Sequence, residues 1–154
     1  MSSVVVLHAV VATFGLWLSV IDLREHRLPD ALTAPLGLGV GIVALVGAQE
    51  GSLASGLLGG VLSAGTFALL ALLPSRPLGW GDVKLQFILG FYLDFLASGL
   101  AFAQAVLSFV LGGMVATVMI FRHRERAKDP VAFGPAMVAA TCMVIIWAQS
   151  GQII

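Results

Sequence analysis

The sequence predicts an all-α fold, a polytopic membrane bundle of about six transmembrane helices. Hydrophobic residues make up 59% of the chain and charged residues only 10%, which is far from the composition of soluble domains. The apolar residues fall in runs that approach the roughly 20 residues needed to cross a bilayer. The basic residues lie beside alternate connections between those runs. We therefore expect a single transmembrane domain over residues 1–154.

Charged residues and Gly or Pro separate the apolar runs. The expected spans are 4–21, 32–48, 53–73, 83–93, 96–121 and 131–147. The fourth is short for a full crossing, so we expect it to be tilted, buried among its neighbours or continuous with flanking residues. A cleaved secretory signal is not expected, because no basic residue precedes the first run and no A-x-A-like site ends it.

The basic residues indicate the orientation of the spans. They follow the first, third and fifth spans: Arg24, Arg27, Arg76, Lys84, Arg122, Arg124, Arg126 and Lys128. Alternating crossings place these connections on one face, and the positive-inside bias makes that face cytoplasmic, with both termini outside. We interpret the cluster after the fifth span as a topology signal rather than a specific lipid site. Membrane lipid is the expected surrounding, and nothing suggests nucleic acid.

Asp22, at the end of the first span, is the first candidate for chemistry. A carboxylate at the hydrocarbon boundary is costly unless it is paired, neutralised or hydrated, which marks it as a functional candidate. The structural alternative is an ion pair with Arg24 or Arg27. Against it, a helix C-terminus disfavours an anion, and Gly15, Ser19 and Asp22 share a small or polar stripe that should face protein. We expect Asp22 to point into the bundle.

Two other side chains within the spans are expected to be structural. His8 lies on the same stripe, about 20 Å of helix rise from Asp22, and we expect it to form an interhelical hydrogen bond. Cys142 is the single cysteine, so it can form neither an intrachain disulfide nor a four-thiolate zinc site. We expect it to be packed in the interior.

Asp82 follows Gly79-Trp80-Gly81 and opens the fourth span, on the same expected face as Asp22. The glycines permit tight turns and close approach of a helix or an extended substrate. We expect Asp82 to be the N-cap of the fourth span, and Asp30, after Pro29, to be that of the second. Capping is the structural alternative to catalysis, and the two are compatible. If Asp22 and Asp82 share a pocket, repulsion leaves one proton shared by the pair, as a water-activating dyad requires.

Other residues near Asp82 are candidates for supporting roles. Gln86, one turn further along, can orient a substrate backbone or pack between helices. Lys84 is expected to extend to the cytoplasmic surface. The full set expected to bind substrate or support the site is Pro29, Asp30, Gly79, Gly81, Lys84 and Gln86.

Three segments together resemble the type IV prepilin peptidases, bacterial membrane aspartyl proteases with a G-x-G-D motif. They are residues 22–33 (DLREHRLPDALT), 79–85 (GWGDVKL) and 132–135 (AFGP). A G-x-G-D motif alone is weakly specific, but with the upstream Asp segment, the interval between the aspartates and the span pattern the resemblance covers nearly the whole chain. It maps the catalytic aspartates of the family onto Asp22 and Asp82.

The resemblance implies an aspartyl endopeptidase of the bacterial inner membrane that needs no metal or cofactor. Its substrates would be prepilin or pseudopilin precursors, whose short basic leader is removed at the cytoplasmic face. The chain is similar to the short, protease-only form associated with tight-adherence (Flp-type) pili, because it lacks the cysteine-paired soluble region of the two-activity members. The pilin that is cut and the oligomeric state stay open.

Two alternatives use the same residues differently. A proton- or cation-coupled transport subunit would use Asp22 and Asp82 as ion ligands or relays. It needs a path to the far face, where only Glu50 and Asp94 supply charge. A non-catalytic assembly subunit would tolerate exchange of both aspartates with loss of stability only.

Overall fold

The structure, a computed structural model, describes residues 3–48, 52–73, 78–122 and 132–151. These residues form six helices and no strand, as the all-α prediction requires. The helices are α1 (Ser3–Glu25), α2 (Asp30–Val46), α3 (Leu53–Ala71), α4 (Trp80–Leu96), α5 (Leu100–Arg122) and α6 (Gly134–Ser150).

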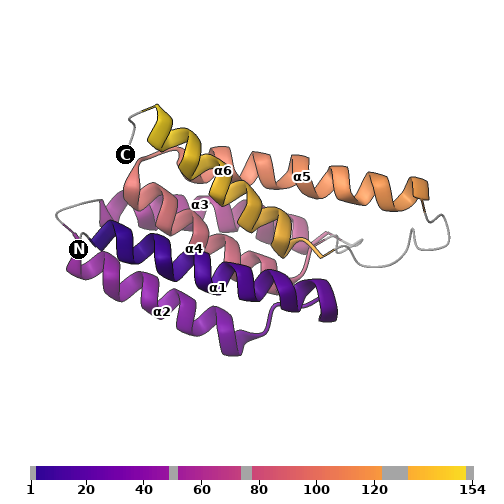
Figure 1. The fold of residues 1–154 in the computed structure, drawn as a ribbon, viewed down its shortest axis with the longest axis horizontal. Coiled ribbons are helices and arrows are strands. Elements are labelled where there is room, and N and C mark those ends of the chain that lie inside the picture. The colour runs from indigo at the N-terminus through magenta and orange to yellow at the C-terminus, as the bar shows by residue number, and fades with distance from the viewer. Residues whose placement is uncertain (1–2, 49–51, 74–77, 123–131, 152–154) are drawn as a thin grey trace.

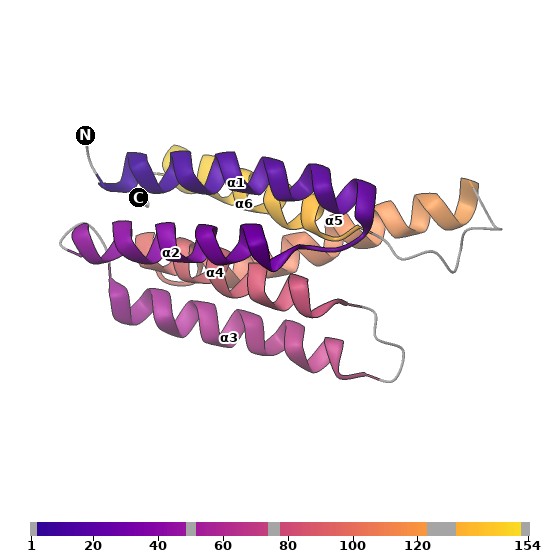
Figure 2. The same ribbon diagram turned by 90° about the horizontal axis from the view of Figure 1, so that it is seen from below.

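The helices lie along one common axis, and each runs antiparallel to the next (Figure 1). At one end of the bundle α1, α3 and α5 finish while α2, α4 and α6 begin; we call this the site end. Helix α5 extends past its neighbours there, as both views show (Figure 2). The prediction that alternate connections share one end of the bundle is confirmed.

The surface of the bundle suits a lipid environment. Within the described residues, the helices Ser3–Glu25 and Leu53–Ala71 and the segment Leu100–Met119 are long and apolar enough to cross a membrane. Large apolar side chains are exposed along the helices, among them those of Leu38 and Phe102. Such a surface is stable where lipid replaces water, and helices satisfy their own backbone hydrogen bonds there. The chain is an integral membrane helical bundle.

Helix α4 lies at the centre of the bundle. It runs from Trp80 to Leu96, so the short apolar run expected at 83–93 is continuous with its flanks. Leu85, Leu89 and Leu93 on α4 are fully buried. The fourth helix is therefore surrounded mainly by protein, which explains why its apolar run is short.

Helix α3 packs closely along α4 through glycines. A Cβ atom at Gly56 would lie 2.9 Å from the backbone oxygen of Phe91, and one at Gly60 would lie 2.9 Å from that of Phe87. Residues without side chains let two helix backbones approach in a membrane, where apolar surface alone gives little drive to associate. This close contact fixes the position of α4 relative to α3.

The α4–α5 connection differs from the prediction. Asp94 lies inside α4 rather than in a turn, and its Oδ1 accepts a hydrogen bond from the Ala101 N–H at 2.8 Å. The chain turns at Gly99, whose φ of 93° is rarely adopted by other residues. Helix α5 therefore begins at Leu100, not at residue 96.

Two predictions about buried side chains are wrong. Cys142 is exposed on α6, because the inner face of that helix is formed by neighbours such as Thr141 and Val144. His8 makes no interhelical hydrogen bond within the described residues: its Nδ1 donates to the Val4 oxygen of its own helix at 2.6 Å. Its contact with α4 is aromatic, edge-on to Tyr92 with ring centroids 5.7 Å apart.

Candidate active site

Asp22 lies near the C-terminal end of α1 and is only 4% exposed. Gly15 and Ser19 on the same stripe are also buried, and the Ser19 hydroxyl donates to the Gly15 oxygen at 2.8 Å. The structural alternative, an ion pair with Arg24 or Arg27, is not formed among the described residues: Arg27 Nε instead contacts Glu25 Oε2 at 3.2 Å. The prediction that Asp22 points into the bundle is confirmed.

The Asp22 carboxylate is bound by the first residue of α6. Its Oδ2 accepts a hydrogen bond from the Gly134 N–H at 2.8 Å. The first N–H groups of a helix have no partner within the helix and carry the positive end of its dipole. A Cβ at position 134 would lie 2.8 Å from Asp22 Oδ2. The absence of a side chain at Gly134 therefore leaves the space that the carboxylate occupies.

Asp82 is held in a similar way at the start of α4. Its Oδ2 accepts a hydrogen bond from the Gly79 N–H at 2.9 Å, and its own N–H donates to the Gly79 oxygen at 3.1 Å. Gly79 is thus the N-cap and Asp82 the third residue of the helix. The prediction of Asp82 as N-cap is wrong by one turn, because the helix already begins at Trp80.

The start of α4 rests on the segment that follows α1. A Cβ at Gly81 would lie 2.9 Å from Leu28 Cβ and 3.3 Å from the Leu28 oxygen, so the two backbones approach closely. The ends of α1 and the starts of α4 and α6 meet at the site end (Figure 1). The fold thus brings two carboxylates that are distant in sequence to one end of the bundle.

Asp30 and Lys84 join the starts of α2 and α4. Lys84 Nζ lies 2.7 Å from Asp30 Oδ1, and both side chains are largely exposed. Pro29 is the N-cap of α2 and no side-chain cap is formed, so the prediction of Asp30 as N-cap is wrong. The carboxylate turns instead toward Lys84. Exposed pairs of this kind contribute about 0–1 kcal/mol, so the pair mainly orients the two helix starts.

Gln86 lies one turn beyond Asp82 and is completely buried. Its Nε2 donates to Gln104 Oε1 of α5 at 2.8 Å. This environment favours the packing interpretation of Gln86 over contact with a substrate backbone. Gln104 was not identified from the sequence, where a single amide in an apolar run was its only signal.

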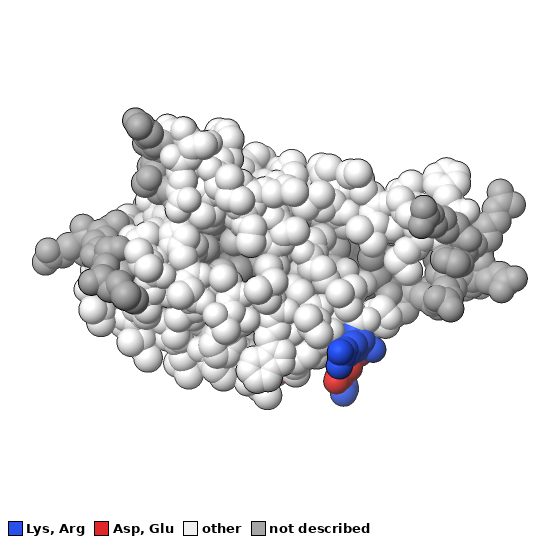
Figure 3. Space-filling view, viewed as in Figure 1, with Lys and Arg blue, Asp and Glu red and all other residues white. Residues whose placement is uncertain are grey.

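Charge is concentrated at the site end. On the face shown in Figure 3, the charged atoms gather where α1 ends, and the other described atoms of that face are uncharged. The Arg76 side chain and the basic cluster of residues 122–128 lie outside the part of the chain whose side chains are described. Among the described residues, no group of three His, Cys, Asp or Glu side chains could hold a metal ion.

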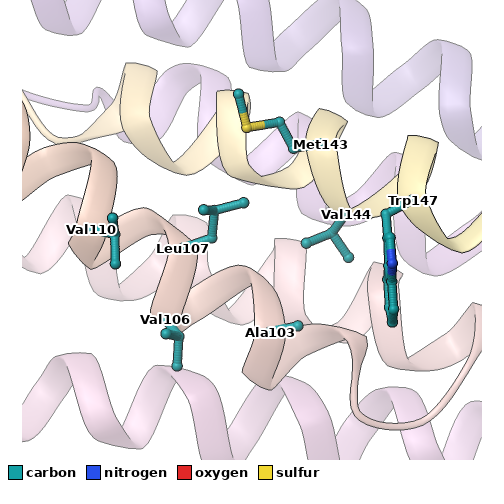
Figure 4. A pocket seen from close by; sticks show the side chains of 7 residues that line it. All are labelled: Ala103, Val106, Leu107, Val110, Met143, Val144 and Trp147. Carbon is teal, nitrogen blue, oxygen red and sulfur yellow. The ribbon is translucent and has the colours of Figure 1, made fainter.

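Two of the cavities formed by the described residues are large enough to accept part of a substrate. One of about 440 Å³ lies between α5 and α6 and is apolar (Figure 4); its lining residues are Ala103, Val106, Leu107, Val110, Met143, Val144 and Trp147. The other, of about 680 Å³, is lined by Asp30, Lys84 and Val83 together with apolar residues of α2, α3 and α4. Of these two, the second adjoins the candidate site, because Val83 follows Asp82.

Sequence comparisons identify relatives of this chain. A prepilin leader peptidase/N-methyltransferase of Stutzerimonas stutzeri is 29% identical over 142 residues, covering 89% of this chain and 48% of that protein. The corresponding protein of Aeromonas hydrophila is 31% identical over 140 residues, covering 86% of this chain and 46% of that protein. The chain therefore spans about half the length of these relatives.

Leader peptidase HopD of Escherichia coli is 33% identical over 129 residues, covering 80% of this chain and 81% of that protein. No solved structure matches the chain significantly. Residues 9–121, which include both aspartates, match the type IV leader peptidase family. The chain belongs to the type IV leader peptidase family.

Proposed function

We propose that this chain is a membrane aspartyl endopeptidase that removes the short basic leader from prepilin-like precursors, with Asp22 and Asp82 as its catalytic pair. Membership of the leader peptidase family supports the reaction class. The observation that carries the assignment of residues is the meeting of α1, α4 and α6 at the site end, where Asp22 is buried and bound to Gly134, and where the start of α4, which carries Asp82, packs closely on Leu28.

The carboxylate geometry suits activation of a water molecule. Each aspartate uses Oδ2 to accept a backbone N–H, from Gly134 in one case and Gly79 in the other. Within the described residues, Oδ1 of Asp22 and of Asp82 accepts no hydrogen bond. Both free oxygens are then available to a water and to the scissile peptide. The backbone hydrogen bonds fix the rotamers, which reduces the ordering needed during catalysis.

The proposed reaction follows general acid–base catalysis by two carboxyl groups. One carboxylate takes a proton from water, whose oxygen attacks the scissile carbonyl carbon. The partner carboxylic acid gives its proton to the amide nitrogen as the C–N bond breaks. The products are a new C-terminal carboxyl group on the leader and a new N-terminal amine on the mature chain.

The substrate and its orientation follow from charge and hydropathy. A precursor with a basic leader and an apolar helix would lie with the leader at the site end and the helix in lipid. The cavity that begins at Asp30 and Lys84 continues among apolar residues of α2, α3 and α4, which suits such a helix. We place the site end at the cytoplasmic face of the bacterial inner membrane, because basic residues favour that side.

The decisive test is co-expression of the protein with an epitope-tagged prepilin and sequencing of the mature N-terminus. Because a positioned acid or base contributes about 10² to 10⁴-fold each, Asp22→Asn and Asp82→Asn should each abolish processing while the protein still inserts. Asp94→Asn is the matched control, since an Asn oxygen can still accept the Ala101 N–H. Full cleavage by either active-site variant would rule out the proposed pair.

A further inference from the structure

A buried polar cluster connects three helices one turn inside the candidate site. Gln86 of α4 and Gln104 and Ser108 of α5 are all fully buried. Gln86 Nε2 donates to Gln104 Oε1 at 2.8 Å. Gln104 Nε2 then donates to the Met137 oxygen of α6 at 3.2 Å and to Ser108 Oγ at 3.1 Å. One amide of α5 thus bonds to both α4 and α6.

The cluster lies about one helical turn from the two aspartates, where it can affect their relative positions. Gln86 lies four residues after Asp82 on α4, and Met137 lies three residues after Gly134 on α6, so each is about one helical turn from the site. Gly134 is the residue that binds the Asp22 carboxylate. The bonds of Gln104 therefore join the helix that carries Asp82 to the helix that holds Asp22.

The polar bonds of the cluster are costly to break. A buried donor or acceptor left without a partner loses about 1–3 kcal/mol, and lipid around the bundle offers no replacement. Gln86 Oε1 has no hydrogen-bond partner among the described residues, so the Gln86 amide is held by its bond to Gln104. Apolar contacts alone allow helices to slide, whereas these directed bonds select one register.

We propose that Gln104 is a positioning residue that sets the separation of Asp22 and Asp82 by holding α4 and α6 in register. Its catalytic consequence rests on the proposed protease function, whereas its effect on the helices does not. Since a misplacement of about 1 Å can cost around 10²-fold in rate, a small shift of α4 against α6 should reduce turnover more than substrate binding.

The test compares Gln104→Leu with Thr141→Val. Thr141 is a buried residue of α6 whose hydroxyl donates to the same Met137 oxygen at 2.8 Å, within its own helix. The control therefore removes a buried hydrogen bond to that carbonyl without releasing another helix. Kinetics on a prepilin in detergent should show kcat reduced about 10-fold or more by Gln104→Leu with KM within about 2-fold, and little change for Thr141→Val.

A second readout is independent of activity. Spin labels on the native Cys142 of α6 and on a Phe87→Cys variant of α4 report the separation of these helices, since both positions are exposed. We expect Gln104→Leu to shift or broaden the distance distribution and Thr141→Val to leave it unchanged. If Gln104→Leu does not fold, the double variant Gln86→Leu/Gln104→Leu takes its place, because it leaves no orphaned Gln amide.

An unchanged label distribution in Gln104→Leu, or in the double variant that replaces it, would overturn the positioning role. Equal loss of kcat in Gln104→Leu and Thr141→Val would also overturn it. The loss would then result from removing any buried hydrogen bond to the Met137 oxygen, and not from separating α6 from α5. If the unmodified protein processes no prepilin, the proposed function fails, and the label distances still decide whether Gln104 joins α4 to α6.

Discussion

The Gly134 N–H donates to Asp22 Oδ2 at 2.8 Å across 112 residues of sequence. This bond places the start of α6 directly on the carboxylate that ends the polar stripe of α1. It makes the third segment of the resemblance, residues 132–135, part of the candidate site. The bond also explains why position 134 is occupied by a residue without a side chain.

Gly134→Ala should therefore reduce processing strongly. The added Cβ would lie 2.8 Å from Asp22 Oδ2 and 3.3 Å from Asp22 Cβ, so the carboxylate has to move. We expect a loss of about 10 to 10²-fold in kcat, measured with a purified prepilin. Gly113→Ala on α5 is the control, because a Cβ there meets nothing within 4 Å. Normal turnover by Gly134→Ala would show that the bond to Asp22 is dispensable.

The two glycines before Asp82 should differ in their tolerance of alanine. At Gly81 an added Cβ would lie 2.9 Å from Leu28 Cβ, whereas at Gly79 the nearest atom would be 3.5 Å away. Gly79 has a φ of −85°, which alanine adopts without strain. Gly81→Ala should reduce processing about 10-fold or more, and Gly79→Ala should stay close to the unmodified protein. Equal sensitivity in a processing assay would contradict this account of the motif.

The Asp30–Lys84 pair should contribute little to stability. Both side chains are largely exposed, so Asp30→Asn or Lys84→Met should lower the free energy of unfolding by no more than about 1 kcal/mol. Thermal unfolding in detergent at low and high salt measures this. The exchange Asp30→Lys/Lys84→Asp should restore most of any loss. A larger loss that the exchange does not restore would mean that one of the two residues acts outside the pair.

Close packing of α3 on α4 predicts a stability defect at Gly60. An alanine Cβ would lie 2.9 Å from the Phe87 backbone oxygen, which cannot rotate away. We expect Gly60→Ala to lower the free energy of unfolding by about 1–3 kcal/mol, the usual cost of overpacking. Gly65→Ala in the same helix, where a Cβ meets nothing within 4 Å, should be neutral or stabilising by up to about 1 kcal/mol. Equal melting temperatures for the two variants would contradict the packing described.

Local details were the weakest part of the sequence predictions. Asp82 and Asp30 were both expected to cap helices, because Asp is a preferred N-cap. The helices begin earlier, at Trp80 and at Asp30 itself, and tertiary contacts decide where each carboxylate turns. Cys142 was expected inside the bundle, but composition alone does not say which side of an apolar helix faces protein. In lipid both sides are apolar, so hydropathy cannot distinguish them.

The sequence by itself determined the class of the fold, the order of the spans and the shared end at which Asp22 and Asp82 lie. These follow from hydropathy, from span length and from the alternating direction of successive spans, which places every second connection at the same end. All three are properties of the chain alone. Only the tertiary structure decided that Gly134 binds Asp22 and that Gln104 joins α4 to α6. Such bonds depend on the rotation and register of packed helices, and directed contacts between residues distant in sequence leave no periodic signal.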